Sequence, residues 1–421
     1  MFSKVKQLFS PQNKDLRKRI VFTLIVLFIF KLGTTIIVPG LDKSKLNTEN
    51  MGFLGLINAM GGGALEKFSI FSLGVMPYIT ASIIVQLLEM DIVPYFSELS
   101  KQGQVGRNKL NMITRVLGIV LAFFQGYMLS FAYIENGSVT DYLQFSLIIT
   151  AGTAFLLWLG DQVTAKGVGN GISLIIMAGI IATLPSMFVD AYNSFIVTDT
   201  TQTLMLGIAK FAIFIAIYVA IIIGVVFVET AERRIPIQYS NSSTRNLGKQ
   251  NYIPFKLNSA GVIPVIFASA LVSIPALLSG FIKNDGFVLF VSKYLTLNTT
   301  TGVILYILFI FVFGYFYTFF QLKPKELAEN LQQNGGYIPG VRPGEETVNY
   351  VSKILKRITI VGTTFLAILA ALPIICARVS SLPSSVSIGG TGLLIVVGVA
   401  LETFKQLESN LVTRKYTRGR R

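Results

Sequence analysis

Ten runs of apolar residues follow one another along the chain, separated by polar and charged segments. They occupy residues 20–38, 74–88, 113–134, 143–159, 172–189, 204–228, 260–281, 302–322, 354–376 and 388–401. Most of them approach the ~20 residues that an α-helix needs to cross the hydrocarbon core of a bilayer. The last run, of fourteen residues, is short enough to be a re-entrant or interfacial segment instead. The pattern predicts an all-α polytopic membrane protein.

Lys and Arg residues are divided unequally between the segments that join these runs. If the N-terminus is cytoplasmic, 28 of them lie in cytoplasmic segments and 6 lie outside, with Lys31 and Lys210 inside apolar runs. Cytoplasmic segments of membrane proteins carry such an excess of basic residues. Nine crossings would place the basic tail, from Lys405 onward, outside. We therefore predict ten crossings with both termini cytoplasmic, and we interpret the first run as a mature span because no signal-cleavage site follows it.

Composition supports a membrane protein and removes most catalytic chemistry. Of the 421 residues, 52% are hydrophobic and 14% are charged, and the mean hydropathy is +0.64. The chain has no histidine and one cysteine, Cys376, which excludes a disulfide framework, a Cys/His zinc site and a histidine-based triad. The glycines of residues 167–171 do not complete a nucleotide-binding motif. We therefore expect no enzymatic activity, no cofactor and no metal.

Ten crossings divide into five plus five around the polar stretch 190–203. Because each set has an odd number, two similar sets would be related by inversion about an axis in the membrane plane. Secondary transporters of small solutes share this design, but they carry polar or charged ligands at the midplane, where these runs offer aliphatic residues. A membrane-anchored nucleic-acid binder is a third hypothesis, prompted by the net charge of +15. The dispersed loop charges provide little compact basic domain for it.

Two local features refine this picture. Gln86, Gln125 and Asn258 lie within or beside apolar runs, where they can link helices by hydrogen bonds or mark a seam that opens. Residues 53–60 precede the second run, and eight residues of helix rise only ~12 Å, too little to cross. This segment is either an external loop or, as we prefer, a short re-entrant helix that lines a cavity.

Several long motifs resemble the SecY family of protein-conducting channels. Residues 62–88, GGALEKFSIFSLGVMPYITASIIVQLL, are similar to the plug and second helix of that family. The resemblance continues in the family's order through WLGDQVTAKGVGNGIS from Trp158, FVETAERRIPIQY from Phe227, LNSAGVIPVIFAS from Leu257, KELAENLQQNGGYIPGVRPGEET from Lys325 and GGTGLLIVVG from Gly389. Motifs of this length, spread over essentially the whole chain, are highly specific.

The resemblance implies ten transmembrane helices in two inverted five-helix halves around a central pore, with a short re-entrant plug helix. The N-terminal half would span residues 1–190, with the plug at about 53–63, and residues 191–203 would form an external hinge. The C-terminal half would span residues 204–421, with cytoplasmic loops at about 229–257 and 323–357. Such a channel passes unfolded preproteins across the bacterial plasma membrane and releases transmembrane segments through a lateral gate between its second and seventh helices.

The family motifs also imply three groups of site residues. An apolar pore ring, which resists wetting and ion leakage at rest, is expected at Val75, Ile79, Ile172, Ile176, Ile266 and Ile395. The plug is expected at Phe53, Leu54, Leu56, Ile57, Met60, Gly61 and Gly62. The lateral gate is expected at Thr80, Ile84, Gln86, Gln125, Asn258 and Ile274, with Thr80 and Gln86 facing Asn258 and Ile274.

Partner proteins are implied as well. The expected partners are the SecE and SecG subunits, the SecA motor ATPase, the ribosome, the signal peptides of preproteins and membrane lipids, without direct nucleic-acid recognition apart from ribosome contact. The expected contact residues are Arg233, Arg234, Arg245, Lys249 and Arg342. Arg342 is the only basic residue between Lys325 and Lys353, and its planar guanidinium suits docking to a carboxylate or to backbone carbonyls.

Overall fold

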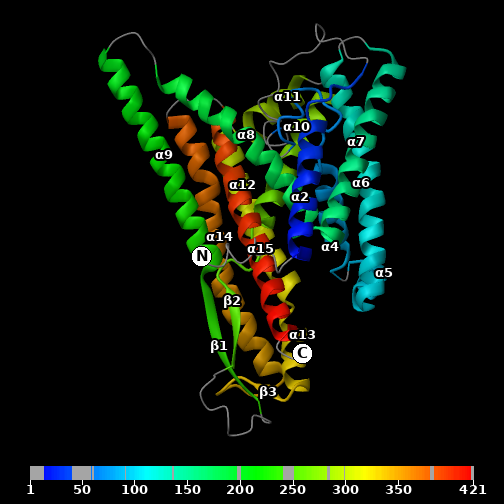
Figure 1. Ribbon diagram of the computed structural model, residues 1–421, viewed down its shortest axis with the longest axis vertical. Helices are drawn as coiled ribbons and strands as arrows, with labels where there is room; N and C mark the ends of the chain where they lie inside the picture. Colours follow the sequence, from blue (N-terminus) through cyan, green and yellow to red (C-terminus); the bar gives the residue numbers. More distant parts are fainter. Residues whose placement is uncertain are drawn as a thin grey trace.

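The protein is described by a computed structural model that covers residues 14–39, 58, 61–90, 92–134, 137–196, 201–239, 251–281, 285–297, 299–379 and 384–418. Within these residues the chain is mostly helical and has one small sheet (Figure 1). The long helices run roughly along the long axis of the molecule, and the three strands lie together beyond one end. This arrangement separates an apolar body from a polar appendage.

Every apolar run of the sequence lies in a helix. The first five runs fall in α2 (Lys14–Gly33), α4 (Met76–Leu88), α6 (Gly103–Tyr133), α7 (Val139–Lys166) and α8 (Gly171–Phe195). The last five fall in α9 (Thr201–Thr230), α10 (Ile263–Phe281), α12 (Thr300–Leu322), α14 (Glu345–Val379) and α15 (Ser384–Arg418). Shorter helices are α5 (Pro94–Lys101), α11 (Asp285–Phe290) and α13 (Pro324–Gln333), and a π-helical turn (Val291–Leu295) follows α11. Hydrophobic patterning therefore located the principal helices, including the fourteen-residue run, which lies within the 35-residue α15.

Six helices in the described part of the chain are long and apolar enough to cross a membrane. Their apolar segments are Gly103–Phe131, Val139–Lys166, Gly171–Phe195, Leu204–Thr230, Thr300–Gln333 and Glu345–Cys376. Helix α4 and the Ile263–Pro275 part of α10 are apolar but shorter. Phe28, Met205 and Phe227 are more than 60% exposed, and exposed apolar surface of this kind is typical of contact with a membrane.

The small sheet packs on the start of α14. Its strands β1 (Glu232–Tyr239), β2 (Asn251–Lys256) and β3 (Gly336–Tyr337) are antiparallel, in the order β2-β1-β3. An apolar cluster joins the sheet to α14 and comprises Ile235, Phe255, Ile338, Val351, Leu355 and Ile358. The sheet, α13 and the C-terminal end of α15 lie at the same end of the molecule (Figure 1). These are the segments in which the sequence concentrates basic residues.

The main core is one apolar cluster that takes residues from helices throughout the chain, from α2 to α15. Phe71 of this cluster stacks on Phe30, also in the cluster, and on the more exposed Phe155 of α7, with ring centroids 6.2 Å apart in both pairs. The backbone N–H of Ile70 donates to the carbonyl of Ile36 over 3.0 Å. The segment that leads into α4 is therefore fixed to α2 and α7, and this contact sets the position at which α4 begins.

Candidate functional site

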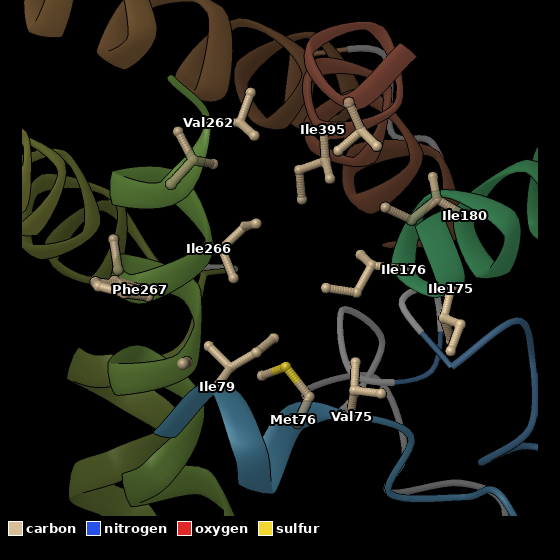
Figure 2. Close-up of a cluster of buried hydrophobic side chains, with 14 of the residues drawn as sticks. Val75, Met76, Ile79, Ile175, Ile176, Ile180, Val262, Ile266, Phe267 and Ile395 are labelled. Atoms are coloured by element: carbon tan, nitrogen blue, oxygen red, sulfur yellow. The ribbon is translucent and has the colours of Figure 1, made fainter. Parts of the chain in front are cut away.

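The six residues expected to form an apolar ring lie on four different helices. Two are at the start of α4, two in the first turns of α8, one in α10 and one in α15: Val75, Ile79, Ile172, Ile176, Ile266 and Ile395. All but Ile172, which is half-buried, are at most 8% exposed. Figure 2 shows Ile79, Ile176, Ile266 and Ile395 pointing toward one another from their separate helices.

Local sequence features determine where two of these helices, α8 and α4, begin. Asn170 is the N-cap of helix α8, and its side-chain oxygen accepts hydrogen bonds from the backbone N–H groups of Ile172 and Ser173 over 3.1 and 3.4 Å. A side-chain oxygen in this position satisfies N–H groups that the helix cannot pair. At α4, Gly74 has a φ of +55°, which side chains disfavour, and it turns the chain just before Val75. Asn170 and Gly74 therefore fix where the aliphatic residues begin.

Further apolar residues join the ring that the family motifs did not name. Met76, Ile180 and Val262 belong to the same buried cluster and lie around the same point in Figure 2, whereas Ile175 and Phe267 of that cluster lie on the far sides of α8 and α10. Helical spacing could have found two of them, because Ile180 follows Ile176 by four residues and Val262 precedes Ile266 by four. The labelled side chains that face this point are all aliphatic or thioether groups. Such a lining opposes water and ions by dewetting and has no charged group with which to coordinate a solute.

The expected plug falls mostly outside the described residues. Phe53, Leu54, Leu56, Ile57 and Met60 are outside them, whereas Gly61 and Gly62 are described and buried. Gly62 has a φ of +74°, and a Cβ atom there would lie 3.3 Å from the Cα of Gly179 on α8. Asn58 donates to Glu66 over 3.2 Å and accepts from its backbone N–H over 3.1 Å. The C-terminal end of the expected plug is thus held close to α8, the helix that carries Ile176.

The expected gate residues lie where α10 packs against α4 and α6. Thr80, Ile84 and Gln86 are on α4, Gln125 is on α6, Ile274 is on α10, and Asn258 precedes α10. The Gln86 amide donates to Ser82 over 3.0 Å within its own helix, while its buried oxygen has no partner among the described residues. An unpartnered buried oxygen is costly, so this stretch of α4 is a weak point of the packing.

The expected orientation of the Asn258 side chain requires a correction. We expected its side chain to face Thr80 and Gln86, but its amide donates to Oε1 of Glu229 on α9 over 2.6 Å and to the carbonyl of Gly261 over 3.0 Å. Both amide hydrogens of Asn258 are therefore bonded to groups at the end of α9 and just before α10. The sequence carried no sign of this pairing, because Glu229 and Asn258 are brought together by the intervening β1–β2 hairpin.

Ionisable residues also enter the helices to a greater extent than the apolar runs suggested. Arg115 on α6 pairs with Asp161 on α7 at 2.7 Å, and Glu229 lies at the end of α9. Arg115 lies at the start of the run 113–134, whereas Asp161 and Glu229 lie just past the runs 143–159 and 204–228, because α7 and α9 extend beyond those runs. The Arg115–Asp161 pair ties α6, a neighbour of α10, to α7.

Comparison with known proteins identifies the family. The family model described as SecY matches residues 69–404, a stretch that contains the ring, the gate residues and the sheet. The chain belongs to the SecY family. The membership that the motifs indicated is thereby confirmed.

Relatives in this family extend over almost the whole chain. The protein translocase subunit SecY of Bacillus licheniformis is 46% identical over 96% of both chains, and that of Staphylococcus epidermidis is 46% identical over 99% of both. Among solved structures, one of a protein-conducting channel aligns with a TM-score of 0.66 at 19% identity, covering 96% of this chain and 94% of the other. Sec61 in a canine ribosome–channel complex aligns with a TM-score of 0.63 at 18% identity, with the same coverage. At these identities the two structures show a shared fold.

Membership of the SecY family determines the class of activity. The chain is a multi-pass membrane protein and a channel subunit of the Sec protein translocase, not an enzyme. The alternative of a small-solute transporter is thereby set aside. Within this family, the buried ring of aliphatic side chains is the feature of the structure that a channel role must explain.

The five residues that the SecY motifs suggest for partner binding differ in their surroundings. Arg234 on β1 pairs with Glu232 over 2.8 Å, and its guanidinium lies 4.7 Å from the ring centroid of Tyr252. Arg233 is exposed beside it, and Arg245 and Lys249 lie outside the described residues. Arg342 is exposed, while its backbone N–H donates to Glu346 over 3.4 Å and its carbonyl accepts from Thr347 over 2.8 Å. Its backbone is thus fixed while its side chain extends into solvent.

Proposed function

We propose that the chain conducts unfolded secretory proteins through the centre of the apolar ring, across the bacterial plasma membrane. The observation that carries this proposal is the convergence of Ile79, Ile176, Ile266 and Ile395 from four helices on one point (Figure 2). Aliphatic side chains exclude ions while they touch one another. They make no directional bonds, so a polypeptide of any sequence can displace them without leaving a buried polar group unpaired.

The whole channel, on this proposal, has ten transmembrane helices in two inverted halves, residues 1–190 and 204–421, hinged at 191–203. Support comes from the ten helices that coincide with the ten apolar runs. The sheet, α13 and the end of α15 carry basic residues and lie at one end of the molecule (Figure 1), which favours that end as the cytoplasmic one. Both termini are then cytoplasmic.

The seam beside the ring serves as the lateral gate. Helices α4 and α10 both contribute residues to the ring and pack against each other, so that their separation would open the ring toward lipid. The unpartnered oxygen of Gln86 lowers the cost of parting the helices. An apolar segment of a translocating chain would leave by this route because lipid accepts it better than the aqueous pore does.

We assign residues 53–63 as the plug on the outer side of the ring. Support comes from its C-terminal end, where Gly62 approaches Gly179 one turn beyond Ile176. This close approach favours glycine at position 62, because a Cβ atom there would lie 3.3 Å from the Cα of Gly179 and the φ of +74° disfavours a side chain. Displacing the plug would uncover the ring without unfolding α8.

Partners would complete the channel. We assign SecE and SecG as companion subunits, with SecA or the ribosome docking on the sheet and on the turn that holds Arg342. Support comes from related channels whose structures were solved in ribosome complexes, canine Sec61 and yeast Ssh1, and from the exposed cations Arg233, Arg234 and Arg342. Arg233 and Arg342 offer planar guanidinium groups to anionic or carbonyl partners.

Cross-linking to a stalled precursor tests the proposed path. Cys376 is first replaced by Ser, and single cysteines then replace Ile79, Ile176, Ile266 or Ile395 in the reconstituted complex. Each should form a disulfide with a cysteine in the translocating segment. Matched cysteines at Ile119 on α6 and Ile304 on α12, which are 38% and 59% exposed, should not. Equal cross-linking at the two sets would place the path elsewhere.

A further inference from the structure

The β1–β2 hairpin joins α9 to α10 through a continuous ladder of hydrogen bonds. The strands pair from Ile237 opposite Asn251 down to Glu232 opposite Lys256. One more backbone bond, from the N–H of Leu257 to the carbonyl of Ala231 over 2.8 Å, extends the ladder past the strands. The hairpin therefore reaches the helices as a paired ribbon, and a displacement of its tip is transmitted to both helix ends.

A side-chain bond closes the ladder at its base. The Asn258 amide, in a residue that is only 3% exposed, donates to the Glu229 carboxylate over 2.6 Å. Its other hydrogen is bonded to the carbonyl of Gly261 over 3.0 Å, where the chain turns with a φ of +62° into α10. A short bond to a carboxylate in a water-poor place is among the stronger hydrogen bonds in proteins. Glu229 thus fixes Asn258, which begins the short turn that leads into α10.

Helices α14 and α15 also contact the segment around Glu229 and Asn258. Lys405 on α15 donates to the backbone carbonyl of Glu229 over 3.4 Å. A Cβ atom on Gly362 of α14 would lie 2.5 Å from the carbonyl oxygen of Leu257, and one on Gly398 of α15 would lie 2.5 Å from Val262. The base of the hairpin is therefore packed against α14 and α15, and α15 also carries Ile395.

The pore ring begins one turn after this base. Asn258 is followed by Val262 and Ile266, which surround the same point as Ile79 and Ile176 in Figure 2. A shift of Asn258 away from Glu229 would change the start of α10 and hence the positions of Val262 and Ile266. Close packing makes such a shift discrete and not gradual.

We propose that the Glu229–Asn258 hydrogen bond is a latch that couples the cytoplasmic hairpin to the α10 side of the pore ring. Glu229 is a positioning residue: it acts on the ring through Asn258 and touches neither the translocating chain nor the ring. A partner that pulls or tilts the hairpin draws Glu229 and Asn258 apart, and α10 then moves. The inference rests on the proposed channel function and adds to it the route by which a cytoplasmic partner reaches the ring.

A double-mutant cycle tests the latch. Glu229→Ala, Asn258→Ala and the double variant are reconstituted as the complete complex, and two properties are measured: resting ion conductance, and translocation of a precursor whose signal sequence carries a charge in its apolar core. Each single variant should increase both, by on the order of tenfold if the lost bond has the strength usual for a charged group. The double variant should increase them no further, because the first change already opens the latch.

Two further variants separate the latch from a general loss of structure. Glu229→Gln keeps an oxygen that accepts from Asn258, so it should restore most of the closed behaviour that Glu229→Ala loses. Glu98→Ala removes an exposed carboxylate on α5, which belongs neither to the hairpin nor to the assigned docking surface, and should leave both properties unchanged.

The latch would be overturned if both single variants kept normal conductance and normal signal-sequence selectivity, or if their effects simply added in the double variant. It would also be overturned if they reduced the amount of assembled complex while the assembled fraction gated normally. The channel function itself is judged separately, by whether replacing Ile79 and Ile266 makes the channel leak. If the Ile79 and Ile266 variant conducts ions at rest while the Glu229 and Asn258 variants behave like the unmodified channel, the latch alone is refuted.

Discussion

Ile79 on α4 and Ile266 on α10 both point into the centre of the buried cluster from neighbouring helices, although they lie in different halves of the chain (Figure 2). Both are buried, at 6% and 8% exposure. Their helices also pack side by side. On the proposed function, one pair of residues belongs both to the seal across the pore and to the seam through which the pore opens toward lipid.

The topology makes a prediction about chemical access. In a background with Cys376→Ser, a Lys415→Cys variant in intact cells should not react with a membrane-impermeant thiol reagent, because the proposed topology places the basic tail in the cytoplasm. A Lys293→Cys variant in the π-helical turn, on the expected outer side, is the control and should react. Labelling at position 415 in intact cells would refute ten crossings with a cytoplasmic C-terminus.

The seam predicts a cross-link between α4 and α10. Cysteines that replace Thr80 or Ile84 on α4, each combined with one at Ile266 or Ile274 on α10, should be joined by a short bifunctional reagent in the resting channel. The link should block translocation, since it prevents the helices from separating, and reduction or cleavage of the link should restore it. The single-cysteine variants, treated identically, should remain active. If none of the four pairs cross-links, α4 and α10 do not form the gate.

Gly62 predicts a role for the plug in the resting seal. Gly62→Val combines a disfavoured φ of +74° with a side chain directed at Gly179, at a cost of about 1 to 3 kcal/mol. We expect the strain to dislodge the plug and to raise resting ion conductance. Gly103→Val is the matched control, because Gly103 has a φ of +64° with nothing within 4 Å of its added Cβ. Equal conductance of the two variants would argue against the plug contact.

Arg342 predicts a defect in motor docking without a defect in folding. Arg342→Glu should slow SecA-driven import by on the order of tenfold or more, since it removes a charged hydrogen-bond donor and adds repulsion. Its backbone bonds to Glu346 and Thr347 do not involve the guanidinium, so expression and resting closure should be unchanged. Lys353→Glu, an equal charge reversal at an exposed site on α14, is the control. Import by the Arg342→Glu variant at the unmodified rate would show that this turn is not the docking site.

The sequence predicted the helices well because burial in a membrane leaves long apolar runs that need no partner to be recognised. The β1–β2 hairpin was read only as a basic loop, since Pro236 and Pro254 interrupt its alternation. Val262 and Ile180 could have been added to the ring from their four-residue spacing, but the convergence of α4, α8, α10 and α15 depends on tertiary packing that no local pattern carries. The Glu229–Asn258 bond could not be predicted for the same reason, because it joins residues on opposite sides of the hairpin.

Resting ion conductance of the double variant Ile79→Gly with Ile266→Gly tests the central claim most directly. The matched variant Ile119→Gly with Ile304→Gly makes the same two changes at exposed positions on α6 and α12. Both double variants therefore lose about 1 kcal/mol of helix stability per glycine. In planar bilayers the ring variant should conduct ions at rest well above the matched variant, because removing two facing aliphatic side chains lets water wet the constriction. Equal conductance of the two variants would contradict the assignment of this buried ring as the seal of a protein-conducting pore.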